Sequence, residues 1–434
     1  ITMADDDPLL TDMSQASGWY AVLPEPAPAN RLKGDQVADW VVVGAGPTGL
    51  AAARRLGELA PEARIILLDS YRVGYGSAGR NAGFIIDTPH LTEELGPDAN
   101  RLVSRLVVAG GAELERLVKK HDIDCEWSPI GHLTACVSEK RISHLHDTCR
   151  TLDASDEPYE WYDKDTLANI VGTDHYHAAV LTPRTVLMNP AAMFRGIGEN
   201  LPENVELYEE SPVQKIASGP PTKIQCAEGT ITAKNVLLTN NVNIKELDYL
   251  KNSVFPLIAC ASLSRPLTEK EQAAMGGAPQ WGITGCATVR RTPSNRILAR
   301  HGTYYTSDFR LSRGQRRDLL KSHRKGILDR FPMLDKLEFE RTWSGVFCMT
   351  RNWASHFGRV EPGVFAALGY CGVGLPRGTA SGKLLAEYAM GSESDLLDDV
   401  QALSNPKPLP PKIFLDLGVR AQLMHYSWKT RTEW

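Results

Sequence analysis

Three glycines of this sequence, Gly44, Gly46 and Gly49, are spaced as in a loop that binds a phosphate. They follow an apolar run that ends at Val43, they precede a helix-forming stretch, and a second apolar run ends at Asp69. A glycine turn that opens a helix presents main-chain N–H groups and the positive end of the helix dipole to an anion. Asp69, twenty-five positions after Gly44, can accept hydrogen bonds from a ribose. Together these features predict a dinucleotide site.

Each glycine has a separate expected role in such a site. Gly44 permits the tight turn, Gly46 lets the main chain approach a pyrophosphate, and Gly49 lets the helix pack closely on the sheet. Glycine triplets also occur in ordinary turns, so the prediction depends on the flanking apolar runs and the terminal acid. The motif does not separate NAD from FAD. A nicotinamide reductase is disfavoured because no second Gly-x-Gly-x-x-Gly follows a strand in mid-chain.

A second glycine-rich segment, residues 74–83, reads Gly-Tyr-Gly-Ser-Ala-Gly-Arg-Asn-Ala-Gly. Its small residues let the main chain lie close to a bulky ligand, and Arg80 can offset phosphate charge; a surface loop is the alternative. With the first motif, the segment resembles the flavin-dependent amine and amino-acid oxidases of the D-amino-acid-oxidase-like superfamily. It is most similar to γ-glutamylputrescine-oxidase-like proteins, which have Gly-Ala-Ser-Gly-Arg-Asn-Gly-Gly here. Ser77 and Ala78 stand in the reverse order in this chain.

The resemblance implies FAD as the cofactor and places it against four stretches of the chain. The implied contacts are Gly44, Gly46, Pro47, Thr48, Gly49 and Asp69; Ser77, Ala78, Arg80, Asn81, Ala82 and Gly83; Val213, Thr239 and Asn240; and Gly345, Cys348, Gly372, Val373, Gly374 and Leu375. In the family, main-chain N–H groups of the last glycine turn bond the pyrimidine edge of the flavin. Donors there stabilise the negative charge that collects on the ring when it accepts a hydride.

One departure from the family pattern bears on the substrate. Glycine-oxidase-like relatives place an arginine two residues after the glycine of Trp-x-Gly, where it pairs a substrate carboxylate. Counted from Gly345, that position is Phe347 here, and a phenyl ring cannot pair a carboxylate. We therefore expect an amine substrate, such as a γ-glutamyl-type polyamine conjugate or another N-substituted amine. Should a carboxylate be bound, the alternative sources of charge are Arg290, Arg300 and Arg377.

Candidate catalytic residues are His301, Tyr370 and Phe347, with Arg300 and His356 as further acid–base candidates. Each has the alternative of a structural role. Hydride loss needs the neutral amine, and a lysine-like amine titrates near ~10.4 in water, so a dry aromatic pocket would favour the reactive form. The aromatic residues expected to line the pocket are Trp281, Tyr304, Tyr305, Trp343 and Phe347.

The sequence leaves two aspects of the flavin chemistry open. Sarcosine oxidases attach FAD to the cysteine of a Cys-Met-x-Thr stretch, and Cys348-Met349-Thr350 is one residue shorter, so we expect non-covalent FAD and keep covalent attachment as the alternative. We expect O2 to reoxidise the flavin and give H2O2; a dehydrogenase that passes electrons to a quinone or carrier protein is the alternative. A non-catalytic flavin-binding protein is disfavoured by the near-complete nucleotide motif.

Composition excludes other functional classes. The chain has 434 residues, 42% of them hydrophobic, and a formal net charge of −4, which gives no basic field for nucleic acid or an anionic membrane. No apolar run approaches the roughly eighteen residues of a membrane helix. Eight scattered cysteines favour neither a metal site nor disulfides, and the acidic residues 1–7 lack a signal-peptide core. We expect a cytoplasmic enzyme without a metal.

The order of apolar runs and helical stretches predicts an α/β fold. A doubly wound, FAD-binding Rossmann-like domain is assembled from separated segments, and a mostly antiparallel α+β domain holds the substrate. The expected ranges are an N-terminal tail at 1–38; the FAD domain at 39–90, 185–245 and 345–395; the substrate domain at 91–184 and 246–344; and a C-terminal extension at 396–434, in which residues 413–426 are amphipathic. Within 91–122 we expect helix with a possible break at Gly110-Gly111.

Overall fold

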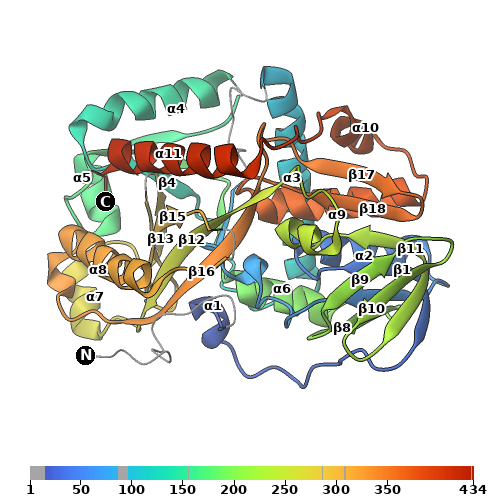
Figure 1. Ribbon diagram of the computed structural model, residues 1–434. Helices are drawn as coiled ribbons and strands as arrows, with labels where there is room; N and C mark the ends of the chain where they lie inside the picture. The colour runs from blue at the N-terminus through green and yellow to red at the C-terminus, as the bar shows by residue number, and fades with distance from the viewer. Residues whose placement is uncertain (1–14, 87–95, 155, 286, 307–308, 432) are drawn as a thin grey trace.

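The computed structural model describes residues 15–86, 96–154, 156–285, 287–306, 309–431 and 433–434. In this part of the chain, two eight-stranded sheets lie side by side, each with its own helices (Figure 1). A two-stranded ribbon of β3 (Phe84–Ile85) and β7 (Val186–Leu187) is the third sheet. One large sheet is mainly parallel and the other mainly antiparallel.

The first sheet has the strand order β17-β18-β11-β1-β2-β8, with β9 and β10 added to β11 as an antiparallel hairpin. β18, β11, β1, β2 and β8 pair in parallel. The bounds are β1 Gln36–Val43, β2 Ile65–Leu68, β8 Val205–Tyr208, β9 Val213–Ala217, β10 Thr222–Cys226, β11 Thr230–Leu238, β17 His356–Glu361 and β18 Val364–Leu368.

The continuous apolar runs that signalled these strands are explained by burial on both faces of the sheet. Val42 and Leu67 pack with helices α2 (Pro47–Leu59), α3 (Gly96–Lys120), α6 (Pro190–Glu199) and α9 (Gly374–Ala389). Val41 and Ile66 pack on the opposite face with η3 (Asn241–Leu247) and with strands of the second sheet. The Rossmann-like part therefore carries its helices mainly on one face, and the second sheet helps to cover the other.

The second sheet has the order β16-β12-β15-β14-β13-β4-β6-β5 and is antiparallel except between β13 and β4. Its bounds are β4 His132–Cys136, β5 Glu160–Asp163, β6 Ala178–Thr182, β12 Phe255–Ser264, β13 Trp281–Thr284, β14 Thr288–Arg291, β15 Ile297–Tyr304 and β16 Phe339–Met349. The remaining helices are α1 Gly18–Ala21, α4 Ile142–Ala154, α5 Lys164–Val171, α7 Glu269–Met275, α8 Arg313–Arg330, α10 Asp395–Ala402 and α11 Lys412–Thr430, with η1 Ser77–Gly79, η2 Glu139–Arg141 and η4 Pro332–Leu334.

Three details differ from the sequence-based expectation. β16 runs unbroken through residue 345, so the domain boundary predicted there falls inside a strand. The expected tail enters the core, because Trp19 is 2% exposed and its Nε1 donates to the carbonyl of Asn81. α3 runs unbroken through Gly110, and a Cβ at that glycine would lie 1.8 Å from the Pro376 carbonyl oxygen. There the glycine allows two helices to approach, and it ends neither of them.

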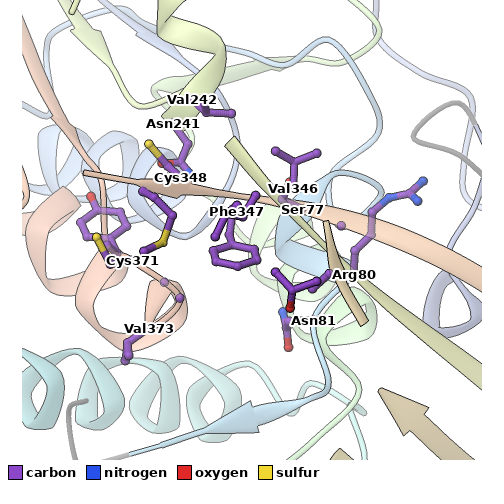
Figure 2. Close-up of a pocket in the computed structure, with 18 of the residues that line it drawn as sticks. Ser77, Arg80, Asn81, Asn241, Val242, Val346, Phe347, Cys348, Cys371 and Val373 are labelled. Atoms are coloured by element: carbon purple, nitrogen blue, oxygen red, sulfur yellow. The ribbon is translucent and has the colours of Figure 1, made fainter. Parts of the chain in front are cut away.

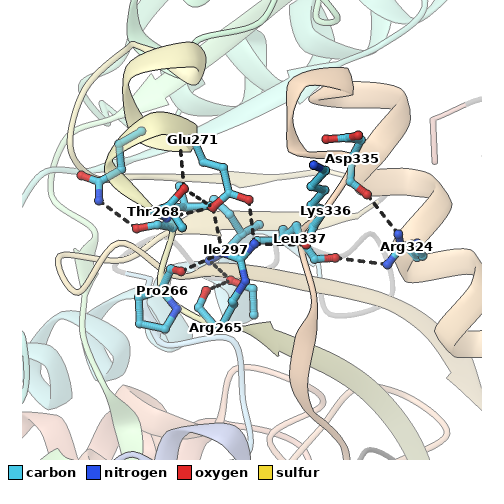
Figure 3. A network of polar contacts seen from close by, with 12 residues as sticks. Arg265, Pro266, Thr268, Glu271, Ile297, Arg324, Asp335, Lys336 and Leu337 are labelled. Atoms are coloured by element: carbon cyan, nitrogen blue, oxygen red, sulfur yellow. Dashed lines mark hydrogen bonds and ion pairs between the residues drawn. The ribbon is translucent and has the colours of Figure 1, made fainter.

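A polar network holds the far end of the second sheet (Figure 3). Arg265, after β12, forms a two-pronged ion pair with Glu271 of α7, with both N–O distances 2.7 Å. The same carboxylate closes a capping box with Thr268. These partners lower the pKa of Glu271 to about 2, with the Arg265 hydrogen bond as the largest cause. A further bond from Arg265 to the Lys336 carbonyl ties α7 to the segment that leads into β16.

Candidate active site

A cavity of about 1970 Å³ lies between the two sheets and is lined from both. Pockets for single drug-sized ligands usually measure about 300–1,000 Å³, so this space suits a large cofactor together with a smaller molecule. One part is a groove along the carboxyl ends of β1, β2 and β11, and the other is a chamber over the second sheet. We call these parts the dinucleotide groove and the substrate chamber.

The glycine loop after β1 has the geometry that its three roles require. Gly44 has φ +103°, and a Cβ there would lie 3.0 Å from the Asn240 main chain. A Cβ at Gly49 would lie 1.6 Å from the Gly44 carbonyl oxygen, whereas one at Gly46 would meet no atom within 4 Å. Thr239 Oγ1 donates to the Gly44 carbonyl at 2.9 Å and holds the loop in place. Gly46 therefore faces the open groove, and Gly49 serves the packing of α2.

Asp69 directly follows β2, and its partly buried side chain lines the groove. Oδ2 accepts a hydrogen bond from Ala45 N at 2.7 Å, and Oδ1 accepts one from Tyr71 N at 2.8 Å. Burial raises the pKa of Asp69 to about 6 despite these donors. A carboxylate offers about four acceptor positions, so capacity remains for two ribose hydroxyls. Val213 lines the same groove.

The second glycine-rich segment forms the wall between groove and chamber, and its polar side chains hold the wall together. Arg80 donates to the carbonyls of Tyr75 at 2.9 Å, Ser344 at 3.0 Å, and Gln15. Arg80 lines the cavity, and Figure 2 shows its guanidinium pointing away from Phe347. These carbonyl contacts give Arg80 a structural role, and the phosphate contact stays a prediction. Asn81 bonds the carbonyl of Ala78.

Five of the six contacts predicted in this wall line the cavity: Ser77, Ala78, Arg80, Asn81 and Ala82. Gly83, with φ +80°, packs outward, because a Cβ there would lie 2.3 Å from Arg290 Nη1.

The C-terminal glycine turn opens α9 at the other end of the groove. Cys371 and Gly372 have φ +51° and +100°, and Val373 is the N-cap of α9. Cβ atoms at Gly372 and Gly374 would meet no atom within 4 Å, and Leu375 also lines the cavity. The first N–H groups of a helix lack partners inside the helix, so this turn offers donors to a bound ring.

Apolar side chains build the wall of the chamber nearest this turn. Phe347 and Met349 of β16 cluster with Phe255 and Leu257 of β12 and with Cys371. Figure 2 shows the Phe347 ring between the Cys371–Val373 turn and the Ser77–Asn81 segment. Three side chains of α11, spaced four residues apart, pack against this cluster: Leu415, Val419 and Leu423. The C-terminal extension thus covers the chamber.

Comparisons with known proteins agree with this geometry. The family described as DAO, FAD dependent oxidoreductase, matches residues 39–388. The chain belongs to this family. It is 26% identical to the gamma-glutamylputrescine oxidoreductase of Escherichia coli, over 86% of this chain and 89% of the relative. It is 24% identical to the probable oxidoreductase OrdL of Haemophilus influenzae, over 90% and 91% of the two chains.

A solved relative has the same fold. The glycine oxidase of Geobacillus kaustophilus superposes with a TM-score of 0.70 at 18% identity, covering 83% of this chain and 96% of that one. This DAO-family protein is an FAD-dependent oxidoreductase that acts on amines or amino acids. FAD supplies the hydride acceptor of this chemistry. The open faces of Gly46, Gly372 and Gly374 and the free acceptor capacity of Asp69 fit that cofactor.

The two titratable catalytic candidates of this DAO-family protein, His301 and Tyr370, both line the cavity, and both make contacts with the framework; a catalytic role for either stays a prediction. The His301 ring stacks on Trp434 with centroids 4.7 Å apart, and burial lowers the pKa of His301 to about 3. The Tyr370 hydroxyl lies 3.0 Å from Thr48 Oγ1, and burial raises the pKa of Tyr370 to about 12. Tyr370 therefore stays neutral and ties the glycine turn to α2. Phe347 lies in the chamber as expected.

Of the other predicted site residues, Cys348 and Gly345 border the cavity and His356 does not. Cys348 packs with Val346 in a core cluster that excludes Phe347, and burial raises the pKa of its thiol well above the ordinary value. It still borders the cavity, as does Gly345, whose Cβ would lie 3.1 Å from Arg80 Cβ. His356 is absent from the residues described as lining the cavity, and burial lowers its pKa.

Two of the expected aromatic residues line the chamber, and the others are structural. Tyr304 and Phe347 border it. Trp281 stacks on Phe331, Trp343 packs edge-on against Trp19, and the Tyr305 hydroxyl donates to Asp416 at 2.7 Å. Aromatic type alone did not distinguish pocket from core, since both environments bury rings.

Several cavity residues carried no recognised motif. Ser70, Tyr71 and Arg72 line the groove directly after Asp69, a position that the ribose argument could have pointed to. Asn241 and Val242 follow the predicted Thr239-Asn240 pair. The side chains of α4 and α11 that border the chamber had no local signal beyond helical spacing. In the described residues, no helix is long and apolar enough to cross a membrane, and no group of three potential metal ligands occurs.

Proposed function

We propose that this protein oxidises a primary or secondary amine: the C–H hydride goes to FAD, the amine N–H proton leaves, and the resulting imine is hydrolysed to a carbonyl. O2 is the proposed acceptor that restores the flavin and becomes H2O2. The observation that carries the proposal is Phe347 in the apolar wall of the chamber, at the position where the glycine-oxidase pattern has an arginine. The name of the Escherichia coli relative, gamma-glutamylputrescine oxidoreductase, supports an amine of the conjugated-polyamine class.

The chamber supports this chemistry through exclusion of water. Phe255, Leu257, Phe347 and Met349 surround the space beside the glycine turn, and α11 covers it. An ammonium ion has no lone pair to assist hydride loss, and desolvation disfavours the charged form. The walls would therefore lower the pKa of a bound amine toward neutrality. No side-chain base is required by this scheme. The low pKa of His301, about 3, and the high pKa of Tyr370, about 12, keep both side chains neutral near pH 7.

The test is an anaerobic panel of amines and amino acids, with bleaching of the flavin absorbance as the signal. We expect N-acylated diamines to bleach the flavin faster than glycine or D-alanine, and Phe347→Arg to shift the preference toward small α-amino acids. Phe347→Leu is the matched control, since it changes the ring and adds no charge. Rapid bleaching by glycine but by no amine would refute the amine assignment. Admission of air then separates an oxidase, whose colour returns at once, from a dehydrogenase.

A further inference from the structure

Arg300 is a cation in the wall of the substrate chamber to which no partner is assigned. It lines the cavity, yet its side chain makes no hydrogen bond or ion pair with any other residue in the described ranges. Its electrostatic neighbours are Tyr426 and Cys260, and the pKa of Cys260 is itself raised to about 12. The Cys260 thiol is therefore neutral near pH 7, and neither neighbour is a carboxylate. Burial lowers the pKa of Arg300, as expected for a guanidinium without a counter-ion.

The strand register shows which face of the sheet carries Arg300. It pairs with Ala261 of β12 and with Thr288 of β14, and directly opposed residues share a face. Ala261 and Leu298, two residues before Arg300, cluster with Trp343 and pack toward Ala82 of the glycine-rich wall. Arg300 and Thr288 are therefore on the face of the second sheet that meets the dinucleotide groove.

The other arginines that line the cavity have assigned contacts. Arg80 bonds main-chain carbonyls, Arg72 pairs with Glu209 at 2.8 Å, and Arg351 donates to the Pro408 carbonyl. Arg310 also has a partner. Two other arginines were alternative sources of positive charge for a bound carboxylate. Arg290 donates hydrogen bonds to the carbonyls of Gly83 and Met188. Arg377 does not line the cavity in the described part of the chain.

We propose that Arg300, with the Thr288 hydroxyl beside it, binds a carboxylate at the end of the substrate remote from the oxidised C–N bond. A guanidinium presents two parallel N–H groups that match a carboxylate. The carboxylate is remote because β16, β12 and β15 are consecutive strands with a spacing of about 4.8 Å, which places the Arg300 main chain about 10 Å from the strand of Phe347. The apolar wall at Phe347 takes the amine end. This inference depends on the proposed amine oxidation in one respect, which is the choice of the end of the substrate that is oxidised.

The first experiment measures binding without turnover. Glutarate, a five-carbon dicarboxylate, and its neutral diamide are titrated into the FAD-loaded protein and followed by calorimetry. We expect glutarate to bind at least 10-fold more tightly than the diamide. Arg300→Met should weaken glutarate binding by about 10- to 100-fold, the range of a charge-assisted hydrogen bond, with Arg300→Lys between the two. Arg351→Met, which removes another cavity arginine, is the matched control and should bind glutarate as the unaltered protein does. Equal binding of glutarate and diamide would overturn the proposal.

The second experiment uses a pair of substrates that differ only in the remote group. N-glutarylputrescine and N-acetylputrescine are compared by anaerobic flavin bleaching. Arg300→Met should raise KM for the glutaryl compound by about 10- to 100-fold and leave the acetyl compound unchanged. Equal KM values for the two amines in the unaltered protein would overturn the anion site and leave amine oxidation standing. If neither amine bleaches the flavin while glutarate binding still depends on Arg300, the amine assignment fails and the anion site stands. Arg300→Gln provides a second neutral variant should the methionine variant not fold.

Discussion

The dinucleotide groove and the substrate chamber are continuous, yet they are built from different atoms. The groove is shaped mainly by main chain, since Gly44, Gly46 and Gly49 matter for the side chains they lack. The chamber is shaped by side chains that project from β12, β15 and β16, such as Phe347 and Arg300, and by one face of α11. A main-chain site needs fixed spacing along one segment, whereas a side-chain site needs only that distant segments meet. The dinucleotide groove can therefore be predicted from sequence, whereas the substrate chamber can change its ligand through single substitutions.

The sharpest test of the main-chain description is Gly46→Leu. The new side chain would enter open groove space, so we expect a folded but colourless protein with FAD affinity reduced by at least about 100-fold, or about 3 kcal/mol. Flavin absorbance at fixed protein concentration measures the bound FAD, and circular dichroism checks that the variant is folded. Gly418→Ala, at another open glycine beside the cavity, should stay yellow. A yellow Gly46→Leu protein would contradict the description of the groove as a site built from main chain.

Asp69→Asn tests the one side chain on which the groove depends. The loss of a charged acceptor should weaken FAD binding by about 10- to 100-fold at pH 7.5. Ribose hydroxyls donate to the ionised acid, so binding lowers the pKa of Asp69 from about 6. FAD affinity should therefore rise with pH up to about 6 and then level off, and the asparagine variant should lose this dependence. Fluorescence of released FAD between pH 5 and 8 measures it; an unchanged profile in the variant would exclude Asp69 as the titrating group.

Two arginines on neighbouring strands of the chamber sheet should respond in opposite directions. Arg300→Met removes a cation without a counter-ion and should stabilise the substrate-free protein by about 1 kcal/mol. Arg290→Met breaks hydrogen bonds to two carbonyls and a stack on Trp19, and should destabilise it by about 2 kcal/mol. Thermal unfolding of the FAD-loaded variants measures both changes in stability. Equal destabilisation by both changes would show that Arg300 is structural.

The smallest expected effect is at Cys348. Its thiol is buried and has a raised pKa, so it is a poor nucleophile, and we expect the FAD to be held without a covalent bond. Acid precipitation should release the yellow colour to the supernatant equally from the unaltered protein and from Cys348→Ala. Colour that stays in the pellet of the unaltered protein and is lost from that of the variant would show covalent attachment.

The contrast between the two regions also explains which sequence predictions succeeded. The order of strand, glycine turn, helix, strand and acid between residues 36 and 69 was read correctly, because each feature depends on neighbours in the chain. The continuity of β16 and of α3 through Gly110 was missed, because a glycine that allows close packing has the same local appearance as one that ends a helix. His301 was an equally local inference, and only the tertiary structure shows that its ring, at the cavity wall, stacks on Trp434.

The sequence by itself determined the family, the cofactor and the position of the dinucleotide groove. Those properties depend on main-chain conformations that glycines and short apolar runs impose over a few residues. The tertiary structure alone decided that α11 covers the chamber and that the side chains of Arg80, Arg290 and Tyr370 bond the framework. It also decided that the Arg300 side chain lines the cavity with no partner among the described residues. The physical reason is that a side chain's charge state and role depend on what surrounds it, and these surroundings come from strands far apart in the sequence.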